Sequence, residues 1–214
     1  MRAFSRGALM VALLSLLAVA CGSSTKKSAS SSTTAAPGTT AAPTTTAAPT
    51  TTTAKSQFTT FGDGTYMVGK TVQPGTYRAP GPGSNCYWER LGGFSGSTSD
   101  IIANNNTGDP SVITIAPTDA GFRTDGCGTW TSDLSAITKS KTSFPAGTYI
   151  VNTDITPGTF SAPGGGTCYW ARLSGFGGSS SEILANDNAT GSTTVTIAAT
   201  DKGFESSGCG TFTS

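Results

Sequence analysis

Six residues, CYWERL at Cys86–Leu91, decide the fold and return almost unchanged as CYWARL at Cys168–Leu173. A short run of aromatic and branched side chains between turn-rich segments is typical of a β-strand. Side chains alternate between the two faces of a strand, so Cys86, Trp88 and Arg90 share one face. Because this face holds the cysteine of an expected disulfide, we expect it to point into the core.

The strand belongs to a longer duplication, in which Gly64–Ser132 is repeated as Gly147–Ser214. The offset is 83 residues and falls to 82 after one deletion. A period of this length contains a whole small domain, unlike the short units of a solenoid. We therefore predict two tandem domains, at residues 62–132 and 145–214, joined by a polar linker at 133–144.

Each copy is predicted to consist of short strands. Segments rich in β-branched and aromatic residues alternate with Gly, Pro and Asn turns, and no helical period exceeds two turns. The predicted class is all-β, with each copy a small antiparallel β-sandwich or barrel of about six or seven strands. In the first copy the expected strands are residues 66–72, 76–79, 86–91, 100–103, 112–116 and 127–131.

The five cysteines divide into two pairs and one odd residue. In an exported chain this parity predicts the disulfides Cys86–Cys127 and Cys168–Cys209, one per copy, with pairing across the copies as the alternative. A unit of about 68 residues buries a thin core and needs such a link. A four-cysteine metal site requires Cys-x-x-Cys pairs, which the 41-residue spacing does not provide, so no metal and no cofactor is expected.

The N-terminus has the pattern of an export signal. Arg2 and Arg6 precede an apolar run, Ala8–Ala20, of 13 residues. A membrane-spanning helix needs roughly 20 apolar residues, so this run predicts a signal peptide at residues 1–20.

The end of that run, Leu16–Gly22, resembles the lipobox of bacterial lipoproteins. The resemblance implies cleavage before Cys21, the odd cysteine, and attachment of acyl chains such as palmitate to it. The protein would then be anchored by lipid to the outer face of the cell membrane. Ala18–Ala20 also satisfies the rule of ordinary signal peptidase, and cleavage there would release a soluble secreted protein.

Residues 21–57 are expected to form a disordered tether. They are almost entirely Ser, Thr, Ala and Pro, and TTAAP recurs at Thr33–Pro37, Thr39–Pro43 and Thr45–Pro49. Such a composition lacks the large apolar side chains that would offset the entropy of ordering. The tether would hold the domains away from a membrane surface.

The composition excludes several functions. The chain has no histidine, which removes Ser-His-Asp and Cys-His catalysis and histidine-ligated metals. The formal net charge is +1 and the sequence has no basic run, so no nucleic-acid partner is expected. A paired-carboxylate glycan hydrolase is the enzyme class left open, and we predict no catalytic activity.

Candidate ligand-binding side chains lie on the two CYW strands. The tryptophans and tyrosines are possible platforms for sugar rings, with core packing against the disulfide as the alternative for the tryptophans. The arginines would bind a ligand carboxylate, or else form internal pairs with Asp119 and Asp201. The six candidates are Tyr87, Trp88, Arg90, Tyr169, Trp170 and Arg172.

Asparagine-rich segments form a second pattern. Asn104–Asn106 with Asp109, and Asn186–Asn188, contain oxygens of the kind that bind calcium. They contain too few carboxylates for a tight site, and asparagine commonly forms turns. We therefore expect turns and no metal site.

Several motifs together resemble a known type of module. They are Tyr66–Gly69, Pro74–Tyr77, Cys86–Leu91 and Gly126–Trp130, each with a counterpart in the second copy. They resemble an uncharacterised module of secreted and lipid-anchored actinobacterial proteins. The resemblance implies a Gram-positive type of cell envelope and no known activity.

The expected function is that of a surface lipoprotein. Two disulfide-linked β domains on a tether would act as a non-catalytic binding module for cell-wall glycan, an extracellular ligand or a partner protein. Duplication favours this, because two weak sites on one chain gain avidity. The alternative is a structural spacer in the envelope with no small ligand, and the sequence does not set an oligomeric state.

Overall fold

A computed structural model describes residues 58–81 and 84–214. The predicted signal peptide, the tether and the lipidation site Cys21 lie outside these residues. The described residues belong to one compact unit, Thr53–Ser214. Within them no helix is long and apolar enough to cross a membrane.

The all-β prediction is confirmed, with two short 3-10 turns as the helical elements of the described chain. The first repeat contains β1 (Thr60–Phe61), β2 (Gly64–Met67), β3 (Gly75–Ala79), β4 (Cys86–Leu91), η1 (Thr98–Asp100), β5 (Ile101–Thr107), β6 (Ser111–Ile115), β7 (Gly121–Asp125) and β8 (Trp130–Thr131). The second contains β9 (Ser143–Phe144), β10 (Gly147–Ile150), β11 (Gly158–Ala162), β12 (Cys168–Leu173), η2 (Ser180–Glu182), β13 (Ile183–Ala189), β14 (Thr193–Ile197), β15 (Gly203–Ser207) and β16 (Phe212–Thr213).

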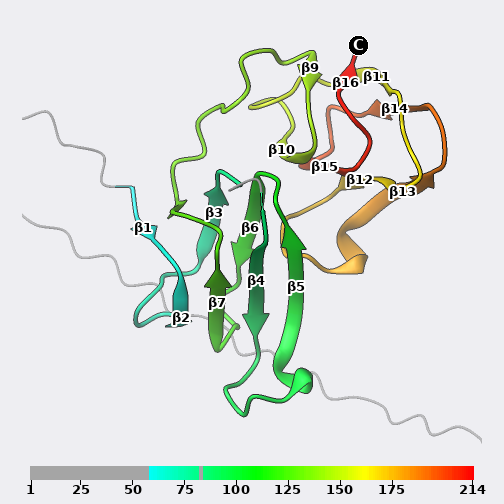
Figure 1. Ribbon diagram of the computed structural model, residues 1–214. Helices are drawn as coiled ribbons and strands as arrows, with labels where there is room; N and C mark the ends of the chain where they lie inside the picture. The colour runs from blue at the N-terminus through cyan, green and yellow to red at the C-terminus, as the bar shows by residue number, and fades with distance from the viewer. Residues whose placement is uncertain (1–57, 82–83) are drawn as a thin grey trace, which may run out of the picture. The chain divides into compact units, whose positions relative to one another are not determined.

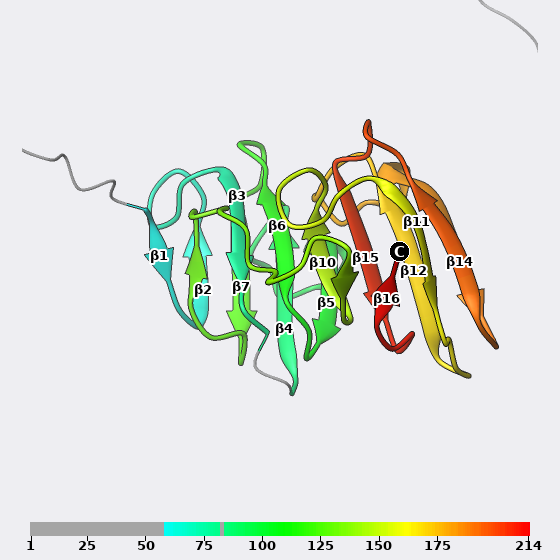
Figure 2. The ribbon, with the colours of Figure 1, turned by 90° about the horizontal axis from the view of Figure 1, so that it is seen from above.

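Both repeats have the same topology of two four-stranded antiparallel sheets (Figures 1 and 2). The strand orders are β1-β8-β3-β6 and β2-β7-β4-β5 in the first repeat, and β9-β16-β11-β14 and β10-β15-β12-β13 in the second. The core of the first repeat draws side chains from both of its sheets, including Trp88 on β4 and Ile113 on β6. Each repeat is therefore a small β-sandwich.

Two strands of each repeat are absent from the sequence prediction. β7 and β15 lie at the centre of their sheets, each between two partner strands. β1 and β9 contribute Phe61 and Phe144 to the cores, and these strands begin at residues 60 and 143. The sequence signal was present, because Phe144 follows Phe61 at the same offset of 83.

The expected turns at the asparagine-rich segments are wrong. Asn104–Asn106 lie within β5, and Asn186–Asn188 lie within β13. Both strands pair along the CYW strands, for example Tyr87 with Asn106 and Tyr169 with Asn188. Pairing with a strongly β-forming neighbour therefore overrides the local preference of asparagine for turns.

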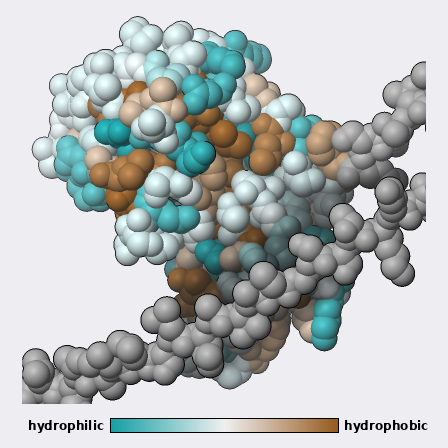
Figure 3. All heavy atoms as spheres, turned by 180° about the vertical axis from the view of Figure 1, so that it is seen from behind, coloured by the Kyte–Doolittle hydropathy of each residue, from teal (hydrophilic) through white to brown (hydrophobic). Residues whose placement is uncertain are grey.

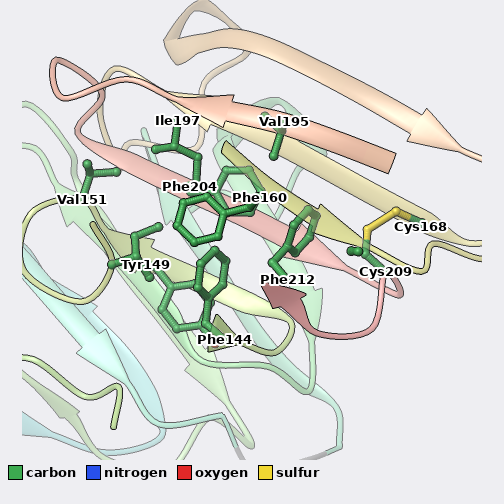
Figure 4. Packing of buried hydrophobic residues seen from close by; sticks show 12 residues of the cluster. Phe144, Tyr149, Val151, Phe160, Cys168, Val195, Ile197, Phe204, Cys209 and Phe212 are labelled. Carbon is green, nitrogen blue, oxygen red and sulfur yellow. A yellow bond between two sulfur atoms is a disulfide. The ribbon is translucent and has the colours of Figure 1, made fainter. Parts of the chain in front are cut away.

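Aromatic rings fill the core of the second repeat (Figure 4). The ring of Phe144 lies 5.1 Å from those of Tyr149 and Phe160, and Phe204 lies 5.1 Å from Phe212. The disulfide Cys168–Cys209 lies beside this cluster, and Cys86–Cys127 occupies the same place in the first repeat. Both bridges join residues within one repeat, separated by 41 positions.

One backbone position explains a difference between the copies. Gly69 has a φ of +76° and its counterpart Asn152 has a φ of +68°. Asparagine is among the few residues other than glycine that adopt this left-handed conformation at modest cost. The turn that closes with the Val68–Val72 and Val151–Ile155 bridges is therefore retained in both copies.

A matched pair of core residues leads to a first prediction. The Trp130 indole N–H donates to the Thr124 hydroxyl at 2.9 Å, whereas Ser206, the counterpart of Thr124, has no hydrogen-bond partner. The reason is that Phe212 replaces the tryptophan and lacks an N–H. We expect Thr124→Val to lower the free energy of unfolding by about 1–3 kcal/mol, because it leaves a buried N–H unpaired.

The matched variant Ser206→Ala should change that free energy by less than about 0.5 kcal/mol or raise it, because it removes an unsatisfied group. Urea denaturation of both variants measures the difference. Equal losses in the two repeats would contradict the assignment.

The two repeats also contact each other. Arg78 on β3 donates to the Asp154 carboxylate at 2.6 and 3.1 Å, and both side chains are buried. The Thr148 amide donates to the Pro110 carbonyl at 2.8 Å. The Asp154 carboxylate also accepts from the amide of Ile137, in the segment between the repeats. The repeats are thus packed together by polar contacts as well as joined by the chain.

Candidate functional site

The two tryptophan candidates lie on the core face of their strands. Trp88 is 5% exposed and stacks against Phe122, and Trp170 is partly buried and stacks against Phe204. The Trp170 N–H donates to the Thr193 hydroxyl. The Trp88 N–H has no partner in the described structure, although its ring edge lines a cavity between the repeats.

The two arginine candidates form internal pairs. Arg90 donates through Nε and Nη2 to Asp119, at 2.8 Å each, and Arg172 makes the same contacts with Asp201. Each aspartate also accepts from a backbone amide three residues earlier, so the pair closes a turn. The pairing raises the pKa of both guanidinium groups, although burial opposes it. The two arginines therefore have a structural role within their sandwiches.

The two tyrosine candidates have different surroundings. The Tyr87 hydroxyl donates to Glu89, and the guanidinium of Arg123 lies 5.9 Å above the Tyr87 ring. The second repeat has Ala171 in place of Glu89 and Glu205 in place of Arg123. Tyr169 therefore lacks these neighbours and lines two adjoining cavities at the contact between the repeats, whereas Tyr87 lines a separate cavity of about 400 Å³ together with Glu89 and Arg123.

We call this place the junction hollow and define it by the four residues common to the two cavities: Asn105, Thr148, Tyr169 and Glu205. Asn105 comes from the first repeat and the other three from the second. The larger, polar cavity has a volume of about 410 Å³, and the smaller one, beside Trp88, has about 80 Å³. The site exists only when both repeats are present.

Burial shifts the pKa of two titratable groups in the junction hollow. Burial raises the pKa of the Glu205 carboxyl above its usual value, and the bond from the Asn105 amide at 3.4 Å opposes the shift. Burial likewise raises the pKa of the Tyr169 hydroxyl, which stays a donor at neutral pH. The hollow thus offers an amide, a phenol and a carboxyl to a ligand, whereas the unpartnered Trp88 N–H nearby is buried.

The described residues contain no group of three or more His, Cys, Asp or Glu side chains that would hold a metal ion. On the face shown in Figure 3, polar residues surround smaller apolar areas. The junction hollow can bind hydroxyl and amide groups of a ligand beside an aromatic ring.

Sequence reasoning missed three of the four residues that define the hollow as site residues. Tyr169 was among the ligand-binding candidates, whereas Asn105 lay in a segment considered for calcium and then expected to form a turn. A signal was available for Glu205, because the aligned position in the first repeat carries the opposite charge, Arg123. A change of charge at one position between two similar copies indicates that this position has different neighbours in each copy.

These features define a class, that of paired β-sandwich modules with one disulfide in each sandwich. A family model described as the Rv1352-like extracellular domain matches the chain twice, at residues 58–131 and 141–213. The chain belongs to this family. The second match begins before residue 145, in agreement with the strand at Ser143–Phe144.

Individual relatives are mycobacterial. The chain is 33% identical over 82 residues to uncharacterized protein Rv1352 of Mycobacterium tuberculosis and to uncharacterized protein Mb1387 of Mycobacterium bovis. Each match covers 32% of this chain and 67% of the relative. No solved structure matches the chain. Neither the family description nor these names indicates a catalytic activity.

Proposed function

We propose that this protein is a non-catalytic binding module of the cell surface, and that its junction hollow binds a hydroxyl-rich ligand of the cell-wall glycan type. The observation that carries the proposal is that Tyr169, Asn105 and Glu205, which come from both repeats, line one polar cavity of about 410 Å³. Sugar recognition typically uses such planar and bidentate polar groups together with an aromatic face.

Display at the membrane is the second part of the proposal. Acylation at Cys21 would anchor the chain, and the Ser/Thr/Ala/Pro segment up to residue 57 would serve as the tether. An anchored protein beneath or within a wall meets its glycan at high local concentration, so a weak site suffices. The partners of this arrangement are the membrane, through the lipid, and the wall.

A spacer without a small ligand is the second candidate function. It is favoured by the burial of Trp88 and by the contact of the two repeats through Arg78 and Asp154. A rigid pair of sandwiches is what a spacer requires. The two functions differ in whether the hollow has a ligand.

The test is sedimentation of the oxidised, exported protein with purified mycobacterial peptidoglycan. We expect saturable binding that weakens about tenfold or more in Tyr169→Ala and in Asn105→Ala/Glu205→Ala, because these changes remove the ring and its polar neighbours. The matched controls are Tyr87→Ala, the same position in the other repeat, and the exposed charge reversal Lys139→Asp, neither of which lines the hollow. Near-UV circular dichroism checks that every variant is folded.

Three results would oppose the proposal. Absence of saturable binding by the intact protein favours the spacer. Equal losses in the controls place binding outside the hollow. Release of reducing ends from the peptidoglycan would reveal a hydrolase, for which Asp109 and Glu205 are the carboxylates that line the larger cavity.

A further inference from the structure

The two repeats contact each other through different surfaces. The second repeat contributes a docking loop, Ser174–Ser181, and the first contributes an acceptor face on β4, β5 and β6. The Phe176 carbonyl accepts from the Thr114 amide at 2.8 Å. The Gly177 carbonyl accepts from Arg90 Nη1 at 2.5 Å.

Gly178 completes this contact. A Cβ on that residue would lie 3.0 Å from the Trp88 ring and 3.1 Å from the Ala103 methyl group, so the loop backbone packs directly on the acceptor face. The contact is head to tail, because it joins the docking loop of one repeat to the acceptor face of the other. Each chain therefore has one unused docking loop on the first repeat and one unused acceptor face on the second.

The unused docking loop is Gly92–Ser99 of the first repeat. Phe94 lies over Gly121 as Phe176 lies over Gly203, which indicates that the two loops have the same conformation. Phe94 is nevertheless 52% exposed, whereas Phe176 is partly buried. Gly96, the counterpart of Gly178, has no atom near the position of a Cβ.

The unused acceptor face lies on the second repeat, at the outer edge of β14. Thr196 is exposed, whereas its counterpart Thr114 is partly buried by the docking loop. Arg172 uses Nε and Nη2 for Asp201 as Arg90 does for Asp119, but its Nη1 makes no hydrogen bond within the described residues. The donors that hold the docking loop in the first repeat are therefore present and unoccupied in the second.

Charge at the unused surfaces is complementary. Within one chain, Asn105 of the acceptor face donates to Glu205 beside the docking loop. The counterparts on the unused surfaces are Asp187 and Arg123, which are both exposed and of opposite charge. A second copy placed as the repeats are placed would bring this pair together.

We propose that the protein self-associates head to tail. The docking loop Gly92–Ser99 of one copy binds the β14 edge of a second copy, with the Phe94 carbonyl on the Thr196 amide and the Ser95 carbonyl on Arg172 Nη1. The arrangement extends to an open chain or closes into a ring, depending on the rotation between copies. The inference is independent of the proposed glycan site.

The association is weaker than the contact within one chain. The buried pair Arg78–Asp154 has Ser161 and Thr71 as its counterparts, so the unused surfaces lack it. Thr194 also replaces Val112 at the strand edge. The assembly therefore depends on concentration, as on a crowded surface.

Sedimentation velocity of the exported protein over a range of concentrations tests the proposal. We expect an average mass that rises above the monomer, and an association weakened about tenfold by Phe94→Asp. Asp187→Arg and Arg123→Asp should each weaken it as well, whereas an equimolar mixture of these two variants should restore it, because every contact then joins opposite charges. Lys139→Asp, an exposed charge reversal on neither surface, is the matched control.

A monomer at every concentration would overturn the proposal. Association that persists unchanged in Phe94→Asp, or that the mixture fails to restore, would overturn the placement of the contact. The mixture keeps the test informative, because its two components must both be folded for the association to return.

Discussion

Arg78→Ala is expected to lower the free energy of unfolding by about 3–5 kcal/mol, because it leaves a buried carboxylate without its counter-charge. Asp154 is 0% exposed and Arg78 is 3% exposed. Without the guanidinium, the carboxylate retains the backbone amides of Ile137 and Ile150 as donors, which do not neutralise its charge. Urea denaturation, followed by tryptophan fluorescence, gives the change.

The first repeat suggests the control for this variant. Its residue at the position of Asp154 is Thr71, whose hydroxyl accepts from the Met67 amide as the Asp154 carboxylate accepts from Ile150. Asp154→Thr with Arg78→Ser therefore removes both charges and keeps the turn. We expect the double variant to be more stable than Arg78→Ala, and a loss below about 1 kcal/mol in Arg78→Ala would contradict a buried ion pair.

Removal of either disulfide is expected to cost about 2–5 kcal/mol, because each bridge restricts the unfolded chain by closing a long loop. Both cysteines of the first bridge are fully buried beside the core, so Cys86→Ala/Cys127→Ala also leaves small voids. Cys168→Ala/Cys209→Ala should show a similar loss, since its sequence separation is the same, 41 residues.

Denaturation with and without dithiothreitol provides the measurement. The reductant should destabilise the wild-type protein and leave a variant without all four of these cysteines unchanged. If the two double variants differ little from the wild type, the packing of each sandwich is sufficient by itself, and a unit of this size does not need a covalent link.

Much of the fold could be predicted from the sequence, because each strand pattern occurs twice in the duplicated chain. Residues 86–91 and 112–116 were predicted as strands from their β-branched and aromatic residues, and β4 and β6 lie at 86–91 and 111–115. β7 was missed because GFRTD has a single large apolar residue, Phe122, and its strand character comes from pairing with β2 and β4. Short edge strands such as Thr60–Phe61 have too few residues for a pattern.

The candidate site was less accessible. Alternation along β4 placed Trp88 on the core face, but it could not show that Tyr169 lines a cavity between the repeats while Tyr87 lies beside Glu89 and Arg123 of its own repeat. That difference depends on Arg123 and Glu89, which approach Tyr87 from the side and have Glu205 and Ala171 as counterparts. Side-chain contacts of this kind are set by neighbouring strands.

The sequence by itself determined the all-β class, the twofold duplication and the cysteine parity, since these follow from local propensity, self-similarity and counting. Only the tertiary structure decided how the repeats meet. Arg78 and Asp154 occur in one copy each. Only the folded structure shows that they form an ion pair, because they are 76 positions apart in the sequence and 2.6 Å apart in space. The physical reason is that a contact between two sandwiches depends on shape and charge across a surface, which no periodicity along the chain encodes.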